Sequence, residues 1–547
     1  SHAAQTICYD LLIKSAFEKR FGDNYILYSN DTVENGNLTN GITAEKEVMA
    51  LDNFSDEKID NTNFELKKLR NVNIQKLLLT RNFIVRYELE LSQGNFDIFK
   101  ELEKINKDNK IPWYLKNKVD EVLNLINSLN GVSKDYFWGF LRFIYKELVI
   151  AKIGCNEYSH YHKGFSSLWN DSLQEKEDKH LALTRLKIKN IDEDFNVVFS
   201  WEHLKDVDFD VELTPFREGD YVIIYPMYEN YKIDPLSNQL LKAEVKEISD
   251  INITVKLFTK LTSQQFLRDF SYWCIESYNS DMNIKVMLKS LYAFMRGDDR
   301  VRELVLCKRR PEFDNTIKIK NDRLDEYQIL NVEKAVNAKD YYLIQGPPGS
   351  GKTSGVLVEI VKNLLEHDEK DIYIIAYTNR AVDEIIGNLI KNNIKCLKIG
   401  DFDGDNGWKF LVNNHSLEDV YYKFKKTRVI VSTVLKLQFY PHLLKVKQFG
   451  TLIVDEATQI LEPMIVGLLS YFDKWILIGD ENQLPAVTEQ STSAKCNLKS
   501  LNDIGLYSFA ESLFLRLKVN AINKGWDDCY GMLQYHYRMH EKLAEFV

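Results

Sequence analysis

The sequence lacks long apolar runs, and it lacks cysteine pairs at the spacing of metal sites. No stretch approaches the roughly 18 consecutive apolar residues of a membrane span, and no basic segment followed by an apolar one opens the chain. The 7 cysteines include no C-x-x-C pair, which argues against a zinc or iron–sulfur site and favours reduced thiols. We therefore expect a protein that binds no membrane and is cytoplasmic, or nuclear if the source is eukaryotic.

An excess of positive charge is missing as well. The formal net charge is −9, which argues against a protein that coats nucleic acid over its whole surface, whereas a motor needs only one basic groove. Each local basic cluster is either a nucleic-acid contact or a solvated face, and the sequence leaves both open. These clusters lie at 308–310 and at Lys423, Lys425, Lys426 and Arg428.

The most informative segment that is present has the sequence G-P-P-G-S-G-K-T. It follows an apolar run at 341–344 and precedes a helical pattern at 356–365, as a phosphate-binding loop requires. Glycines let backbone N–H groups turn toward phosphates, Lys352 reaches the outer phosphates, and the Thr353 hydroxyl ligates Mg²⁺. The pattern predicts that ATP and Mg²⁺ are the cofactors, bound at Gly346, Pro347, Pro348, Gly349, Ser350, Gly351, Lys352, Thr353 and Ser354.

Beyond this loop, strand patterns alternate with helical ones. The β-branched runs at 372–375, 429–431, 451–454 and 475–478 fit a parallel sheet that is covered on both faces. Polar residues follow each run at its carboxyl end, where open α/β sheets bind their ligands. The sequence therefore predicts one nucleotide site at this edge of the sheet.

Three polar residues at that edge have the chemistry for nucleotide hydrolysis. Asp455 directly follows a buried strand and is predicted to hold Mg²⁺, while Glu456 is predicted to orient and deprotonate the attacking water. Gln483 follows the next strand and offers a neutral sensor of the terminal phosphate. The alternatives are a helix cap for the two acids and a proline-terminated loop for the glutamine.

The first half of the chain has a different organisation. The pattern is mainly helical at 66–152, it alternates with a period of two at 181–258, and helical spacing returns at 264–296. Short alternating runs of this kind predict a small β-barrel.

Taken together, the motifs resemble superfamily 1 helicases of the 5′-to-3′ branch. Six motifs match in order. They are Gln328, the segment at 376–383, Ser432-Thr433, the segments at 455–459 and 479–485, and the Tyr-Arg-Met-His at 537–540. The resemblance implies an α/β fold, with a RecA-like P-loop motor lobe and its parallel sheet preceded by a small β-barrel, a helical stalk and a helical domain.

The same resemblance implies roles for further residues. Gln328 would read the adenine, and Arg538 would act as an arginine finger on the transferred phosphoryl group. Thr378, Asn379 and Thr433 would contact strand phosphates, which position a strand without reading its sequence. A second RecA-like lobe is expected beyond Val547.

Within this branch the sequence is most similar to the DNA-replication nuclease-helicase family that processes Okazaki flaps. Gln5 and Tyr9 fit the Q-x-x-x-Y helix that ends the nuclease core in that family, although an ordinary amphipathic helix explains them equally well. The iron–sulfur cysteines of the family have no counterpart between Asp10 and Lys152, so nuclease activity stays open.

The sequence thus predicts an ATP hydrolase that acts as a helicase or translocase on single-stranded DNA, with RNA as the alternative strand. A nucleic-acid-activated ATPase switch that gates a partner or a nuclease is the competing function. The expected domains are a nuclease-core remnant at 1–90, a helical connecting domain at 91–204, the barrel at 205–262, a helical stalk at 263–325, the RecA-like lobe at 326–535 and the start of a second lobe at 536–547.

Overall fold

The structure, a computed structural model, describes most of the chain. The described residues are 25–29, 64–68, 71–108, 110–111, 113–154, 164–178, 181–192, 195–202, 216–235, 238–258, 265–278, 282–399, 417–490 and 494–537. Contacts divide the chain into two compact units. We call residues 1–87 with 151–280 the barrel unit, and residues 88–150 with 281–547 the motor unit.

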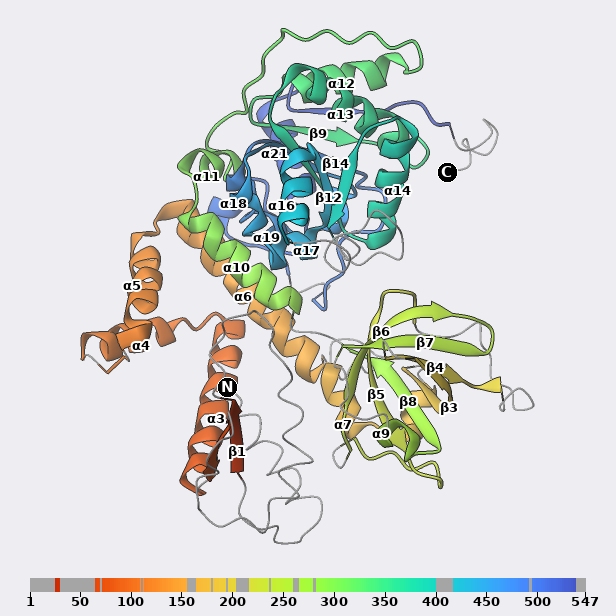
Figure 1. The fold of residues 1–547 in the computed structure, drawn as a ribbon. Helices are drawn as coiled ribbons and strands as arrows, with labels where there is room; N and C mark the ends of the chain where they lie inside the picture. The colour runs from red at the N-terminus through yellow and green to blue at the C-terminus, as the bar shows by residue number, and fades with distance from the viewer. Residues whose placement is uncertain are drawn as a thin grey trace. The chain divides into compact units, whose positions relative to one another are not determined.

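The barrel unit contains a closed antiparallel barrel with the strand order β3-β4-β7-β6-β5-β8 (Figure 1). Along β7, buried residues alternate with half-buried ones, because successive side chains of a strand point to opposite faces. The strands are β3 (Ala182–Ile191), β4 (Asn196–Ser200), β5 (Tyr221–Met227), β6 (Leu241–Ile248), β7 (Asn252–Leu257) and β8 (Tyr272–Ser277).

This barrel is larger than the 205–262 range expected from the sequence, because β3, β4 and β8 also belong to it. The helical spacing expected at 264–296 is wrong at β8. Four successive residues of this strand, 273–276, are buried, so the strand shows no alternation. In β3 the register shifts between Leu183 and Leu186, and Arg185 adopts a positive φ of 56°. A bulge of this kind also interrupts the period of two.

Two of the three short helices lie against the outside of the barrel, and the third, which contains Leu267, packs into its core. The Lys176 ammonium is fully buried and donates to Glu276 Oε1 at 2.6 Å and to the Leu168 carbonyl at 3.1 Å. This ion pair fixes the segment that contains α7 and α8 to the wall strand β8. The helices of the unit are α7 (Ser167–Asn170), α8 (Leu173–Asp178) and α9 (Gln265–Arg268), and a separate antiparallel pair is formed by β1 (Tyr25–Ser29) and β2 (Phe64–Lys68).

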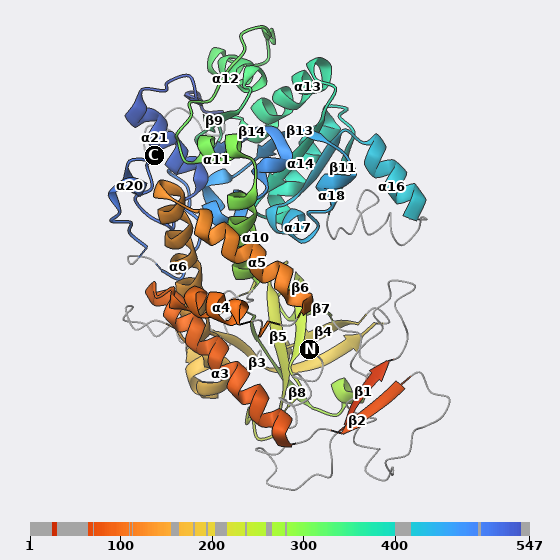
Figure 2. The ribbon, with the colours of Figure 1, turned by 90° about the vertical axis from the view of Figure 1, so that its left-hand side faces the viewer.

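The motor unit is built on a parallel seven-stranded sheet with the order β11-β12-β10-β13-β14-β9-β15. Figure 2 shows β9, β14, β13 and β11 in this order across the sheet. This sheet confirms the expected α/β class. Its strands are β9 (Tyr341–Gln345), β10 (Asp371–Ala376), β11 (Cys396–Ile399), β12 (Val429–Thr433), β13 (Phe449–Val454), β14 (Phe472–Gly479) and β15 (Tyr530–Met532).

Both faces of the sheet are covered by helices, so its central strands are mostly buried, whereas β15 has no buried residue. One core holds apolar residues of α12, α13 and α14. A second core, on the other face, holds those of α6, α10, α16 and α17. The helices of the second core and its surroundings are α6 (Gly131–Ile153), α10 (Met282–Arg296), α11 (Asp299–Val305), α16 (Leu417–Lys426), α17 (Val434–Phe439), α18 (Leu443–Val446), α19 (Glu462–Ile465), α20 (Lys499–Asn502) and α21 (Leu513–Lys524).

The remaining helices complete the fold. Those of the first core are α12 (Glu326–Asn337), α13 (Val358–His367), which continues the turn Lys352–Leu357 (η4), and α14 (Asn379–Lys391). The helical segment before the barrel consists of α3 (Asn71–Gln93), α4 (Asp97–Lys107), α5 (Trp113–Ser128) and α6. Among the described residues, no helix is both long enough and apolar enough to cross a membrane.

A buried ion pair joins three helices of the motor unit. Arg516 of α21 donates to both carboxylate oxygens of Glu462 at 2.7 Å, and both side chains are fully buried. Tyr136 of α6 donates to the same carboxylate at 2.6 Å. This carboxylate holds α6 and α21 to α19 within the motor unit.

We expect Arg516→Met to lower the free energy of unfolding by about 3–5 kcal/mol, because it leaves the Glu462 carboxylate buried without its counter-charge. Arg296→Ala is the matched control, since its ion pair with Glu121 is half-exposed and is worth at most about 1 kcal/mol. Urea titration of both variants measures the difference. Equal losses in the two variants would show that the buried pair is not a structural anchor.

Candidate nucleotide-binding site

The phosphate loop connects β9 to the helix that continues as α13, and its glycines are there for steric reasons. A Cβ on Gly346 would come within 2.3 Å of Lys352 Cγ. Gly351 has a φ of +78°, and a Cβ there would lie 2.8 Å from Gln328 Nε2. Side chains at these two positions would displace the lysine and the glutamine, so the loop requires glycine at both.

Lys352 carries a buried ammonium that lacks a hydrogen-bond acceptor among the described residues. Its residue is only 7% exposed, and the nearest carboxylate oxygen, Glu456 Oε1, lies 3.7 Å from Nζ. A buried unpaired charge is costly, and it is retained where a ligand supplies the missing acceptors. The outer phosphates of a nucleotide are acceptors of this kind, so Lys352 fits a triphosphate.

Thr353 and Asp455 lie together at the same edge of the sheet. The Thr353 hydroxyl donates to Asp455 Oδ2 at 2.9 Å, and Asp455 is 2% exposed. Burial and the neighbouring Glu456 carboxylate raise the pKa of Asp455 to about 6, although the Thr353 hydrogen bond and Lys352 oppose this. A hydroxyl and a carboxylate at this distance form the oxygen donor set that Mg²⁺ prefers, and a bound cation would stabilise the ionised form of Asp455.

Glu456 stands in a strained backbone conformation. Its φ of 52° and ψ of 40° lie in the left-handed region, which is unusual for a residue with a side chain. Its Oε2 atom is buried and makes no hydrogen bond with a described residue, while its N–H donates to Asp455 Oδ1 at 3.0 Å. Strained residues of this kind cluster at functional sites. The free oxygen is available to accept a proton from water.

Asp480 organises the loop that follows β14, although no role was predicted for it. Its fully buried carboxylate accepts the Gln345 amide at 2.8 Å and the Gln483 amide at 3.1 Å. The Gly346 N–H donates to the Gly479 carbonyl at 2.9 Å, which joins the phosphate loop to the same strand end. Asp480 therefore connects the candidate sensor Gln483 to Gln345, the residue that directly precedes the phosphate loop.

Gln328 also touches the phosphate loop. Its Nε2 donates to the Ser350 carbonyl at 2.9 Å, and its Oε1 accepts the Asp325 N–H at 3.2 Å. In return the Asp325 carboxylate accepts the Gln328 N–H, so the two residues form a capping box at the start of α12. The nitrogen and the oxygen of this side-chain amide thus both have hydrogen-bond partners. That Gln328 reads the adenine stays a prediction.

We expect Gln328→Ala to weaken ATP binding roughly tenfold, because a buried hydrogen bond to the phosphate loop is worth about 1.5 kcal/mol. Gln438→Ala is the matched control. Its amide donates to the Met464 carbonyl at 2.7 Å and is also buried, but it lies on α17 and contacts α19 instead of the phosphate loop. Binding of fluorescent ATP and GTP analogues measures the effect. Unchanged affinity in Gln328→Ala would exclude a role in the nucleotide site.

The candidate strand-contacting residues lie at the carboxyl ends of adjacent strands. Thr378 and Thr433 cap α14 and α17, and their hydroxyls accept the N–H groups of Ala381 at 3.2 Å and Lys436 at 3.3 Å. Asn379 is the first residue of α14. Since β10 pairs with both β12 and β13, these residues share one edge of the sheet with Asp455.

Some predicted residues lie outside the described part of the chain. These are Arg538, Gln5 and Tyr9. The residue before Arg538 is described, and it contacts the site. The Tyr537 hydroxyl donates to Asp325 at 2.5 Å, and its N–H donates to the Gly349 carbonyl at 2.8 Å. The segment that leads to Arg538 is therefore attached to the phosphate loop.

The chain is similar in sequence to several known proteins. The family described as an AAA domain matches residues 323–421 and 420–491. The DNA replication ATP-dependent helicase/nuclease of Arabidopsis thaliana is 30% identical over 361 residues, which cover 62% of this chain and 25% of that protein. The proteins of the same description from Saccharomyces cerevisiae and Homo sapiens are 32% and 25% identical, over 36% and 61% of this chain and 14% and 31% of their own.

These matches span less than a third of each relative. A solved structure, an arterivirus helicase in complex with DNA, has a TM-score of 0.28 and 13% identity, covering 61% of this chain and 56% of that one. That similarity is too low to argue from. In its sequence matches and its assembled motifs the chain is similar to superfamily 1 helicases, in particular to the DNA replication ATP-dependent helicase/nucleases.

Proposed function

We propose that the chain is the motor portion of an ATP-driven helicase that moves 5′-to-3′ along single-stranded DNA, as part of a larger nuclease-helicase in DNA replication, repair or defence. The observation that carries this proposal is that the buried Lys352 ammonium has no hydrogen-bond acceptor among the described residues and lies 3.7 Å from Glu456 Oε1, while the other carboxylate oxygen of Glu456 makes no hydrogen bond with them. The relatives named above are described as ATP-dependent helicase/nucleases, which supports the same activity.

In this mechanism each residue of the site has one task. Lys352 holds the outer phosphates, and Glu456 orients the attacking water and takes its proton. Thr353 and Asp455 would hold Mg²⁺, and a bound Mg²⁺ would supply positive charge to neutralise the phosphates. Gln483 senses the terminal phosphate. Its hydrogen bond to Asp480, which also accepts the Gln345 amide, connects it to the residue before the phosphate loop.

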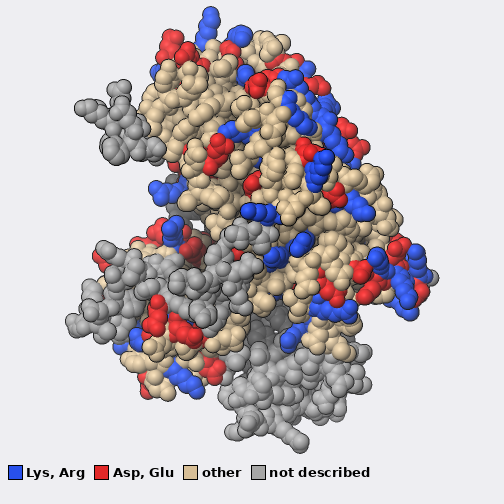
Figure 3. Space-filling view, turned by 180° about the vertical axis from the view of Figure 1, so that it is seen from behind, with Lys and Arg blue, Asp and Glu red and all other residues tan. Residues whose placement is uncertain are grey.

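The strand would bind beside this site. Thr378, Asn379 and Thr433 lie at the same edge of the sheet as Asp455, so nucleotide hydrolysis and strand binding occur on neighbouring loops. On the face shown in Figure 3, basic and acidic side chains are interspersed. This distribution favours a local nucleic-acid contact over a surface that is basic throughout.

Unwinding assays on 5′- and 3′-tailed duplexes of DNA and of RNA, with the full-length protein, test the proposal. We expect ATP-dependent unwinding of 5′-tailed DNA. Unwinding of RNA alone would identify an RNA helicase of the same branch. ATP hydrolysis that responds to nucleic acid without any unwinding would instead support the nucleic-acid-activated switch.

A further inference from the structure

The loop that follows β14 is fastened at both ends and open in between. We call residues 480–490 the sensor loop, because they include the candidate sensor glutamine. The first residue of the loop, Asp480, is fully buried, and the last, Gln490, is 3% exposed. Between them the side chains of Leu484 and Val487 are 80% and 82% exposed. Packing constrains these two side chains little, so the hydrogen bonds at the two ends largely determine where the loop lies.

The far end of the sensor loop is held by a single carboxylate of α6. Glu147 is 6% exposed, and its Oε2 accepts the Glu489 N–H while its Oε1 accepts the Gln490 N–H, both at 2.9 Å. The Gln490 amide donates to the same Oε1 and to the Phe143 carbonyl, each at 2.9 Å. Hydrogen bonds to an ionised acceptor are about twice as strong as those between neutral groups. Both oxygens of this carboxylate therefore fix the loop end to α6.

Burying the Glu147 carboxylate has a cost. Burial raises the pKa of Glu147, and the hydrogen bonds from Glu489 and Gln490 oppose this shift only in part. A buried ionised group is kept where hydrogen bonds satisfy it, and here the donors that do so come from the sensor loop. What the molecule gains from this buried charge is a fixed loop end.

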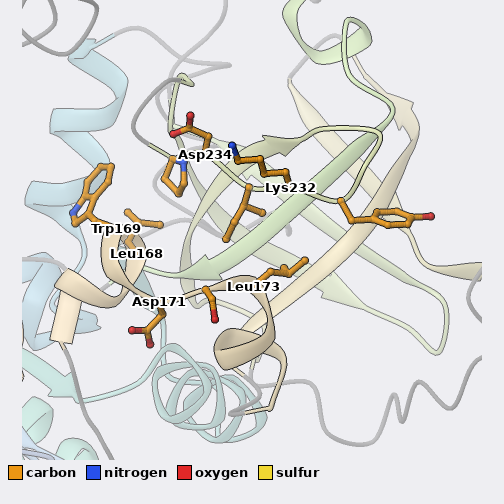
Figure 4. A pocket seen from close by; sticks show the side chains of 10 residues that line it. Leu168, Trp169, Asp171, Leu173, Lys232 and Asp234 are labelled. Atoms are coloured by element: carbon orange, nitrogen blue, oxygen red, sulfur yellow. The ribbon is translucent and has the colours of Figure 1, made fainter. Parts of the chain in front are cut away.

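Glu147 has no place in a ligand site. Both of its oxygens already accept hydrogen bonds from the sensor loop. A pocket of about 290 Å³ lies in the barrel unit, and Figure 4 shows Trp169, Asp171 and Lys232 among the side chains that line it. None of the residues that line this pocket comes from α6 or from the sensor loop. The Glu147 carboxylate therefore acts on the nucleotide site through the loop.

The near end of the same loop is connected to the phosphate loop. Asp480 accepts the Gln345 amide at 2.8 Å and the Gln483 amide at 3.1 Å. A loop that is fixed at one end can swing about it, whereas a loop that is fixed at both ends leaves Gln483 few positions. Position matters for catalysis, because a displacement of about 1 Å can lower a rate roughly a hundredfold.

We propose that Glu147 is a positioning residue for ATP hydrolysis. By holding the far end of the sensor loop on α6, it keeps Gln483 where it senses the terminal phosphate. This inference rests on the proposed function and deepens it, because it adds a residue of α6 to the nucleotide site.

Steady-state ATP turnover of Glu147→Gln in the full-length protein, at saturating single-stranded DNA, tests this role. The amide has the size of the carboxylate but only one acceptor oxygen, so an N–H group at the loop end loses its partner. We expect kcat to fall about tenfold, the factor that corresponds to one hydrogen bond to a charged group. KM for ATP should stay within about twofold of the wild-type value, because Glu147 does not touch the nucleotide site.

A double variant separates positioning from a merely structural role. Residues that act as a unit have non-additive effects on the rate. If Glu147 acts through Gln483, then Glu147→Gln combined with Gln483→Ala should turn over ATP no more slowly than Gln483→Ala alone. Losses that multiply in the double variant would overturn the proposal, because they would show that the two residues act independently.

Asp135→Asn is the matched control, because Asp135 also lies on α6 and accepts the Ser500 hydroxyl at 2.6 Å, away from the sensor loop. Wild-type kcat in Glu147→Gln, or an equal loss in this control, would overturn the positioning role and leave the proposed function intact. If Glu147→Gln does not fold, Gln490→Ala decides the question by the same measurements, because it removes the amide and keeps the carboxylate. A wild-type protein that hydrolyses no ATP would contradict the proposed function itself.

Discussion

Lys352→Ala is expected to reduce ATP turnover by the full-length protein by about a thousandfold, because it removes the buried cation that faces the outer phosphates. The fold should be retained. Lys352 has no hydrogen-bond acceptor among the described residues, so its removal relieves a desolvated charge and breaks no anchor of the structure. Steady-state phosphate release measures the turnover, and the thermal unfolding midpoint without nucleotide checks the fold.

The control for this variant is Lys362→Ala. Lys362 lies on α13, which continues the same helix, but its side chain is 35% exposed and pairs with Glu359 at 3.6 Å. We expect wild-type turnover in this variant. Retained turnover in Lys352→Ala, or a lowered unfolding midpoint without nucleotide, would contradict the role assigned to Lys352.

Glu456→Gln is expected to preserve ATP binding and to lower turnover by about 10²–10⁴-fold, the usual range for loss of a general base. The amide has the size of the carboxylate but cannot accept a proton from water. Fluorescent-nucleotide titration measures the binding, and single-turnover hydrolysis of ATP measures the chemical step.

The neighbouring acid Glu481 provides the control, because it lies in the loop after β14 and pairs with Lys518 at 2.8 Å. Glu481→Gln should hydrolyse ATP at the wild-type rate. If Glu456→Gln failed to bind ATP, then Glu456 would be a ligand-binding residue and not the water activator.

The candidate nucleotide site was recognisable in the sequence because its parts follow short-range rules. The phosphate loop has fixed glycine positions, and each acid directly follows a strand that is recognisable by its β-branched run. The parallel sheet then brings Thr353 and Asp455, far apart in the chain, within 2.9 Å of each other. The capping box of Asp325 and Gln328 also has a visible signature, D-x-x-Q before a helix, which the sequence analysis used only for its glutamine.

Other features depend on which strands become neighbours, and no local pattern contains that information. The hydrogen bond from the Gln345 amide to the Asp480 carboxylate forms because β9 pairs with β14. The buried pair of Arg516 and Glu462 depends on the packing of α21 against α19. The strand β8 was missed because four successive residues of it are buried, which removes the alternation, whereas β3 and β4 lie inside the alternating range 181–258 but outside the expected barrel bounds.

The central claim is that ATP cleavage beside Lys352 and Glu456 is coupled to a bound polynucleotide. The most direct measurement is the steady-state ATPase rate of the full-length protein, titrated with single-stranded DNA, for the wild type and for Glu456→Gln. The account predicts a rate that rises with DNA and saturates in the wild type, and a rate at background in the variant at every DNA concentration. A wild-type rate that no nucleic acid changes, or a variant rate equal to that of the wild type, would contradict it.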